Sequence, residues 1–271
     1  MVKVPLYSID GKEIEQIELP EFFSSKINFY LIARAAIADQ TKLYQPKGNY
    51  IYAGLQTSAK YRGRKGDYGS LKNRGQARLP REVLPKGNWG KVRRIPSAVK
   101  GRRAHPPKVE KKIIEKINKK EYTKALMSAL AACTNSHLAL KRGHKFKKDL
   151  TLPVVLESEE GIKKTSEAYH LFSAIGVGED ILRAKQKTKV VSGVRRRKGG
   201  KKTPKSLLVV VENISSPVAK ASKNLPGVDV VESKDLRVVD LAPGTHPGRL
   251  LVITKKALET LSQKISKNLM G

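Results

Sequence analysis

The residues whose types and spacing could support catalysis or cofactor binding are few, and each motif fails on its local context. Gly176-Val177-Gly178 resembles a dinucleotide-binding turn, but a helical pattern precedes it and Ile181 replaces the third glycine. In "RRRKGGKKTPK", Arg195 takes the place of the first glycine of a phosphate-binding loop, and Lys202 takes that of its Ser or Thr. We therefore interpret the first motif as a break between two helices and the second as a run of cations.

Side chains suited to metal binding or nucleophilic catalysis are scattered. The histidines, at positions 105, 137, 144, 170 and 246, show neither HxxxH nor HExxH spacing. Ser136 and His137 are adjacent, so on a helix they point about 100° apart. Cys133, the single cysteine, lies on an apolar helical face and is interpreted as a core residue. We expect no catalytic residue, no metal and no cofactor, and hence a protein that is not an enzyme.

The cationic side chains are the strongest chemical signal. The chain has 271 residues and a formal net charge of +31. Residues 45–104 hold sixteen Lys or Arg against two acids, and residues 183–205 hold eleven against none. The rest of the chain is close to balanced, with 28 basic and 22 acidic residues. Charge concentrated in two segments predicts a polyanionic partner, nucleic acid before an anionic membrane.

Residues 45–104 have the composition of an RNA-contacting segment. Arginine forks bind phosphate, glycine permits close backbone approach, and the interleaved Tyr and Trp side chains can stack on unpaired bases. No helical or strand period is sustained there, so we expect the segment to lack fixed structure until RNA orders it. A disordered basic linker is the competing interpretation, although strings such as "RRIPSAVKGRRAHPP" are not of low complexity. The run at 195–202 could instead be a solvated charge run or a localisation signal.

The candidate RNA-binding residues are cations and their polar or aromatic neighbours in these two segments. They are Lys60, Arg62, Arg64, Lys65, Lys72, Arg74, Gln76, Arg78, Arg81, Trp89, Arg93, Arg94, Lys100, Arg102, Arg103, His105, Arg195, Arg196, Arg197, Lys198, Lys201 and Lys202.

The rest of the chain predicts the domain that must carry these segments. Residues 2–19 alternate around Asp10-Gly11, which predicts a β-hairpin with a two-residue type I′ turn. Helical spacing runs from Pro20 to about Tyr44, then through a short helix near 108–117 and a longer one to Gly143. The apolar runs 152–157 and 206–212 predict buried parallel strands, and two further strands and several helices follow. We expect a three-layer α/β/α domain with a mostly parallel sheet, formed by residues 1–44 and 105–271, from which 45–104 extends as a long internal loop.

Several strings, met in order, carry a family resemblance: "AGLQTSAKYRG", "RGQARLP", "RRIPSAVKGRRAHPPK", "ALMSALAAC", "LPVVLE" and "LAPGTHPGRLLVIT". Together they resemble the universal large-subunit ribosomal protein four family in its archaeal form, over nearly the whole chain. Two departures are a longer stretch between Gly63 and Arg74 and an apparent insertion at "VLPKGNW".

The resemblance implies a structural protein of the large ribosomal subunit, cytoplasmic and ribosome-bound. Its expected partners are large-subunit ribosomal RNA, neighbouring large-subunit proteins and the nascent peptide, with no membrane. It also implies that the long loop reaches the peptide exit tunnel, and by match of the string the tunnel-facing candidates are Arg74, Gly75, Gln76, Ala77 and Arg78. The alternatives are an RNA-binding regulator acting off the ribosome and an RNA-modifying enzyme, although no catalytic group supports the enzyme.

Overall fold

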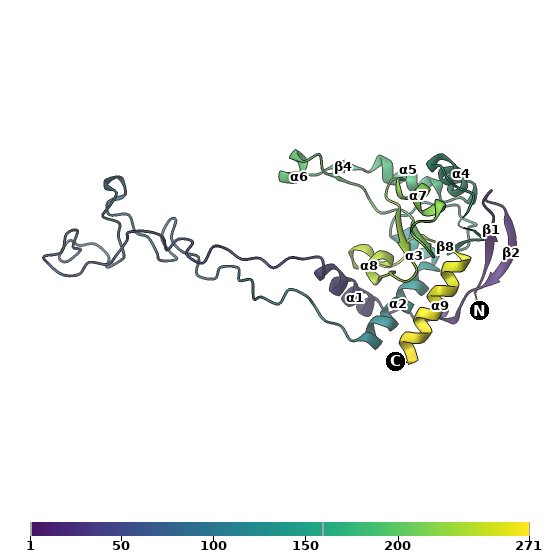
Figure 1. Ribbon diagram of the computed structural model, residues 1–271, viewed down its shortest axis with the longest axis horizontal. Coiled ribbons are helices and arrows are strands. Elements are labelled where there is room, and N and C mark those ends of the chain that lie inside the picture. The colour runs from purple at the N-terminus through teal and green to yellow at the C-terminus, as the bar shows by residue number, and fades with distance from the viewer. Residues whose placement is uncertain (1, 159, 271) are drawn as a thin grey trace. The chain divides into compact units, whose positions relative to one another are not determined.

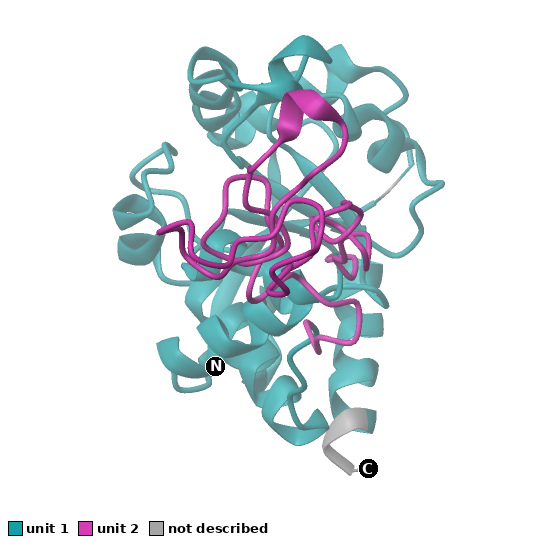
Figure 2. Cartoon of the chain, turned by 90° about the vertical axis from the view of Figure 1, so that its left-hand side faces the viewer, with its two compact units in different colours: residues 1–43, 114–271 teal, residues 44–113 magenta. Residues whose placement is uncertain are grey.

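The structure, a computed structural model, describes residues 2–158 and 160–270. The chain divides into two compact units, residues 1–43 with 114–271 and residues 44–113, which we call the body and the insertion (Figures 1 and 2). The sequence predicted the end of the insertion at residue 104, whereas the structure places it at Ile113. The difference arises because residues 108–117, predicted as a short helix, contain no helix and continue the irregular backbone.

A six-stranded sheet, in the order β2-β1-β3-β8-β6-β7, forms the centre of the body. Strand β1 pairs antiparallel with β2, and every other neighbouring pair is parallel. Strands β3, β6 and β8 are buried along their whole length, as expected of continuous apolar runs inside a parallel sheet. The bounds are β1 Lys3–Tyr7, β2 Glu13–Glu18, β3 Val154–Leu156, β6 Leu208–Val211, β7 Asp229–Glu232 and β8 Leu251–Thr254.

Helices cover both faces of this sheet (Figure 1). In β6, Leu208 and Val210 belong to one buried apolar cluster, while Val209 and Val211 belong to the other. The first cluster includes α1 Phe29–Thr41, α2 Lys119–Cys133, α8 Val238–Leu241 and α9 Lys255–Met270; the second includes α4 Thr165–Ile175, α5 Gly178–Gln186 and α7 Pro217–Lys223. Because side chains alternate along a strand, this division confirms the predicted three-layer α/β/α domain.

The hairpin turn differs from its prediction. Strands β1 and β2 are joined by residues 8–12, in which the Gly11 N–H donates to Ser8 O (3.1 Å) and the Ser8 N–H to Lys12 O (2.8 Å). Gly11 alone of the predicted pair has a positive φ, of 79°. A type I′ turn requires positive φ at both central residues, so the connection is instead a longer turn with a glycine at its left-handed position.

Polar caps divide two predicted helices. The pattern from Pro20 becomes a short 3-10 helix, Glu21–Ser24, followed by α1, whose first turn is capped by Asn28 Oδ1 accepting from Leu31 N (3.1 Å). Similarly, α2 ends at Cys133, and Asn135 caps α3 Ser136–Lys141 by accepting from His137 N (3.0 Å). Side chains that bond the backbone locally favour helix starts over helix interiors, which apolar periodicity alone does not reveal.

Hydrogen bonds within the body connect the two points at which the insertion begins and ends. Thr41, the last residue of α1, accepts a hydrogen bond from Glu115 N at 3.1 Å. Two residues earlier, the buried Asp39 carboxylate accepts from Tyr122 of α2 (2.7 Å) and pairs with Lys42 (3.0 Å). Burial, together with the Asp39 carboxylate, raises the pKa of Tyr122. The insertion therefore leaves and re-enters the body through a fixed neck, whatever the insertion itself does.

Candidate nucleic-acid interface

The insertion contains a hydrogen-bonded segment, residues 58–94, that composition did not predict. Lys60 and Arg81 exchange both backbone hydrogen bonds (3.3 and 3.2 Å), and Arg81 also bridges to Val92. Leu71 and Val83 are 7% and 5% exposed, and the Tyr68 and Trp89 rings meet edge to face at 5.3 Å. We call residues 58–94 the folded segment. Its internal hydrogen bonds and small apolar contacts were not indicated by the composition of the insertion.

Some predicted RNA-binding arginines point inward in this segment. Arg81 is half-buried and donates to Gly90 O (2.9 Å) and Ala77 O (3.3 Å). Arg93, whose side chain is 13% exposed, pairs with the buried Glu82 at 3.5 Å and also donates to a backbone carbonyl. Guanidinium groups that donate to internal carbonyls and pair with a buried acid hold the backbone together and present fewer donors to a phosphate.

Most of the other predicted residues in the insertion face solvent. Those with exposed side chains are Lys60, Arg64, Lys65, Lys72, Arg74, Gln76, Arg78, Trp89, Arg94, Lys100, Arg102, Arg103 and His105, whereas Arg62 is half-buried. The tunnel-facing candidates, residues 74–78, form an exposed turn in which Gly75 has a φ of 64°. Arg81 contacts this turn through its hydrogen bond to the carbonyl of Ala77, the residue that precedes the exposed Arg78.

The second basic segment is a hairpin, not an open loop. Strands β4 Lys189–Val190 and β5 Lys201–Lys202 pair antiparallel, and α6 Val194–Arg197 lies at the turn. Lys189 lies directly opposite Lys202 and all the predicted cations from Arg195 to Lys202 are exposed. Like charges directly opposite one another destabilise a strand pair, so the facing lysines weaken this hairpin. Arg183 and Lys205, at the ends of the predicted segment, instead pair with Asp180 and Asp229 of the body.

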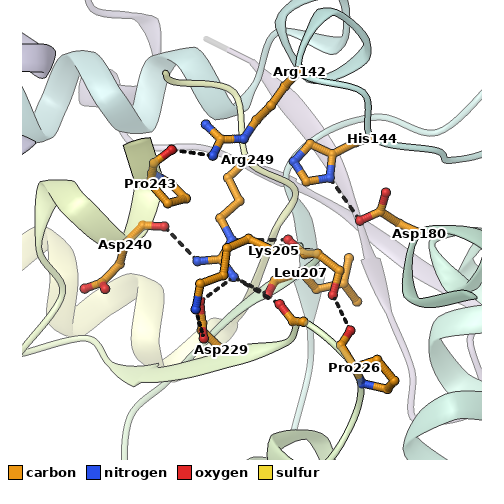
Figure 3. A network of polar contacts seen from close by, with 12 residues as sticks. Arg142, His144, Asp180, Lys205, Leu207, Pro226, Asp229, Asp240, Pro243 and Arg249 are labelled. Carbon is orange, nitrogen blue, oxygen red and sulfur yellow. Dashed lines mark hydrogen bonds and ion pairs between the residues drawn. The ribbon is translucent and has the colours of Figure 1, made fainter. Parts of the chain in front are cut away.

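A buried arginine missed by the sequence analysis fixes the body where β6, β7 and β8 meet (Figure 3). Arg249 is 1% exposed and pairs with Asp229 at 2.7 Å. It also donates to the carbonyls of Ser206 (3.1 Å), Leu207 (2.9 Å) and Asp240 (2.9 Å). Burial alone would raise the pKa of Asp229, but Arg249 and Lys205 hold it below its usual value. The signal in the sequence was the position of Arg249 directly before the apolar run of β8. Its partner Asp229 could be identified only from the fold.

A second buried network involves Asp180, at the start of α5, whose carboxylate is 0% exposed. Oδ1 accepts from Arg183 Nε (2.7 Å) and from Lys145 N (2.9 Å), and Oδ2 lies 2.9 Å from His144 Nδ1. Burial would raise the pKa of Asp180, yet His144 and Arg183 lower it below its usual value. The carboxylate is therefore ionised at neutral pH and orients both cationic and imidazole groups around it.

The residues weighed for catalysis do not form a catalytic group. Cys133 is 1% exposed, and burial raises the pKa of its thiol to about 12, which leaves it an inert core residue. No group of three or more His, Cys, Asp or Glu side chains suited to a metal ion occurs within residues 2–158 and 160–270. In the same ranges, no helix has the length and apolar character needed to cross a membrane.

Comparison with known proteins agrees with the resemblance. The model of the ribosomal protein L4/L1 family matches residues 17–264. The large ribosomal subunit protein uL4 of Methanocaldococcus jannaschii is 43% identical over 97% of this chain and 99% of its own length. Its counterpart in Methanosphaera stadtmanae is 42% identical over 99% of both chains, and that of Saccharolobus islandicus is 37% identical over 97% of this chain and 94% of its own. The chain therefore belongs to the ribosomal protein L4/L1 family, a family of structural proteins rather than enzymes.

Proposed function

We propose that this chain is a structural constituent of the large ribosomal subunit and that its insertion binds large-subunit ribosomal RNA. The observation that carries the proposal is the separation of charge: sixteen Lys or Arg lie in residues 45–104, and most of these side chains face solvent. Free cations at this density attract a polyanion, and the relatives are named as large-subunit proteins. The protein would then act in the cytoplasm, bound to the ribosome and to neighbouring large-subunit proteins.

The mechanism divides the insertion into two parts. Ordering a free residue costs about 1–2 kcal/mol in backbone entropy, and the folded segment has already met part of that cost. The flanking residues 44–57 and 95–113 contain no helix or strand and need RNA to hold them. Release of counterions from neutralised phosphates supplies that free energy. The insertion would thus join RNA segments that are distant in the RNA sequence and stabilise their arrangement during assembly.

We further propose that residues 74–78 contact the nascent peptide in the exit tunnel. Support comes from the match of "RGQARLP" to the family and from the exposed turn at Gly75. Without a side chain, Gly75 takes its left-handed conformation free of steric cost, and a Cβ atom added there would meet no other atom within 4 Å. The space beside Gly75 is therefore open to a ligand.

The experiment that tests this function is a deletion of residues 60–95, reconstituted into large subunits. The neck formed by Thr41, Glu115, Asp39 and Tyr122 lies outside the deletion, so the body is expected to fold normally. We expect particles that assemble poorly or lose the protein when sedimented through moderately high salt. Normal particles with normal peptide passage would refute the role of the insertion. Wild-type protein that washes off large subunits in the same salt would favour the regulator acting off the ribosome.

A further inference from the structure

The body contains a cationic cleft that lies outside the insertion and that no motif indicated. Its volume is about 900 Å³, and its walls include Phe29, Lys141, Arg142, His144, Arg183 and Lys202. The described residues that line it include no Asp or Glu. The hairpin strand β5 contributes Lys202 to the lining, so the second basic segment borders the cleft. A cleft with this lining selects an anionic ligand.

One lining residue of this cleft, His144, presents a hydrogen-bond acceptor, which an anion cannot satisfy. His144 is 2% exposed in its side chain, and its Nδ1 faces the Asp180 carboxylate (Figure 3). Because the ionised carboxylate only accepts, Nδ1 carries the proton, and Nε2 of the neutral ring is an acceptor. Nε2 is buried and has no hydrogen-bond partner among the residues that the structure describes. Burial lowers the pKa of His144 despite the opposing effect of Asp180, so the ring is neutral at neutral pH.

The cations of the cleft are held in place before any ligand arrives. Arg142 donates to Pro243 O at 2.7 Å and also to His246 O, which fixes its guanidinium while leaving other N–H groups free. Arg183 is locked to Asp180 and to Lys205 O at 2.9 Å. Donors whose rotamers are already fixed lose little entropy on binding. Lys141, in contrast, ends α3 with an exposed ammonium that adds mobile charge at the wall.

A site for phosphate alone would contain only donors, whereas this one buries an acceptor among them. In RNA, each phosphate is adjacent to a ribose whose 2′-hydroxyl can donate a hydrogen bond, a group that DNA lacks. Phe29, which is 52% exposed and also lines the cleft, offers an aromatic face to a base. Phosphate, 2′-hydroxyl and base together therefore match the three kinds of group in the cleft.

We propose that this cleft binds a single-stranded RNA segment, with a phosphate at Arg142 and Lys141 and a base against Phe29. Because His144 Nε2 is closed to solvent in the free protein, the cleft wall must shift when RNA binds, so that a 2′-hydroxyl can donate to that nitrogen. The proposal rests on the proposed RNA-binding function and adds a second, RNA-selective contact in the body. It assigns the Asp180 carboxylate a positioning role, because that group holds the imidazole in the tautomer that accepts.

The test is 2′-deoxy interference mapping with the full-length protein and transcribed large-subunit ribosomal RNA of Methanocaldococcus jannaschii. RNA carrying random 2′-deoxy substitutions is separated into bound and free fractions with wild-type protein and with His144→Asn. The Asn amide can still donate to Asp180, but it removes Nε2. We expect one or a few positions where the deoxy substitution weakens wild-type binding about three- to tenfold and has no effect on His144→Asn. Identical interference patterns for the two proteins would overturn the site. The same result is expected if His144 Nε2 bonds to water and not to a 2′-hydroxyl, so that alternative is tested as well.

A matched pair of lysines tests the charge of the site. Lys141 and Lys223 are both exposed and both lie in the last turn of a short helix, α3 and α7, but only Lys141 lines the cleft. Lys141→Gln should weaken protection of the same RNA positions, while Lys223→Gln should leave it unchanged. Equal effects of the two variants would overturn the assignment.

Two further results separate this site from its alternatives. If millimolar inorganic phosphate abolishes the His144-dependent interference, the cleft is a general anion site and the RNA-segment proposal fails. If instead the protein shows no preference for ribosomal RNA over DNA of equal length at any position, the proposed function itself fails. If RNA binds through the insertion but the interference does not depend on His144, only the cleft proposal fails. Urea unfolding of His144→Asn confirms that the variant compared is folded.

Discussion

Two pairs of arginines in the insertion are predicted to have different roles, and replacing each pair tests that difference. The outer pair, Arg74 and Arg78, is exposed on the turn next to Gly75. The inner pair, Arg81 and Arg93, donates to internal carbonyls and to Glu82. Both double Arg→Gln variants remove two positive charges, so any difference between them reflects position and not net charge.

For the outer pair we expect a loss of counterion release. Each phosphate contact contributes about 0.7–0.9 to the slope of log K against log salt concentration. Losing both Arg74 and Arg78 should reduce the slope by about 1.5. Because their side chains have no role in the contacts of the folded segment, amide exchange in the free protein should stay as in the wild type.

For the inner pair we expect a loss of local order. Arg81 makes two hydrogen bonds to carbonyls, and Arg93 adds an ion pair and one further bond. Each such bond contributes about 0.5–1.5 kcal/mol net, and partial exposure favours the lower part of that range, so the pair should stabilise the folded segment by about 2 kcal/mol. Exchange should then accelerate up to about 30-fold at Glu82 and Gly90, whose N–H groups bond to Lys91 O and Glu82 O.

The assays are filter binding of full-length protein to Methanocaldococcus jannaschii large-subunit ribosomal RNA over a range of salt, and hydrogen exchange on the RNA-free protein. The inner variant should bind more weakly at every salt concentration, with little change in slope. If the inner variant reduced the slope as much as the outer one and left exchange at Glu82 and Gly90 unaltered, the division into structural and RNA-contacting arginines would be refuted.

Two further predictions concern the body. Arg249→Met should lower the free energy of unfolding by about 3 kcal/mol in urea titrations, because it removes the buried partner of Asp229 and the hydrogen bonds to the Ser206 and Asp240 carbonyls. The partial exposure of Asp229 keeps the loss at the low end of the range for broken buried pairs, and a loss under about 1 kcal/mol would contradict the bracing role. The folded-state pKa values of His144 and Asp180 are both lowered from the unfolded values of 6.5 and 3.8. Each group therefore contributes its full stabilisation of the fold above its unfolded pKa and loses it as the pH falls from that value through the lower, folded-state pKa. Stability should therefore decline from about pH 6.5 downward, and His144→Asn should lose less than the wild type between about pH 7.5 and 5.5; parallel declines would exclude His144 as the source.

The sequence analysis identified elements wherever a signal is local. Consecutive residues are enough to predict the apolar strands β3, β6 and β8 and the helix break at Gly176. The structure confirms all four. Predictions failed where a short polar cap competed with apolar periodicity, as at Asn28 and Asn135. The helix predicted at 108–117 is absent from the structure. Periodic apolar residues form a stable helix only where a packing surface is available to them.

Sequence alone determined that most of the excess positive charge of this chain lies in two segments and that the rest is close to balanced, because charge is a property of residue type. Only the tertiary structure decided what each cation does. Arg74 and Arg81 are chemically identical, yet one is exposed and the other bonds to Gly90 and Ala77 carbonyls. The pairing of Arg249 with Asp229 and of His144 with Asp180 joins residues 20 and 36 positions apart. Burial and partner choice depend on such long-range contacts, and these exist only once the sheet and its two helical layers have assembled.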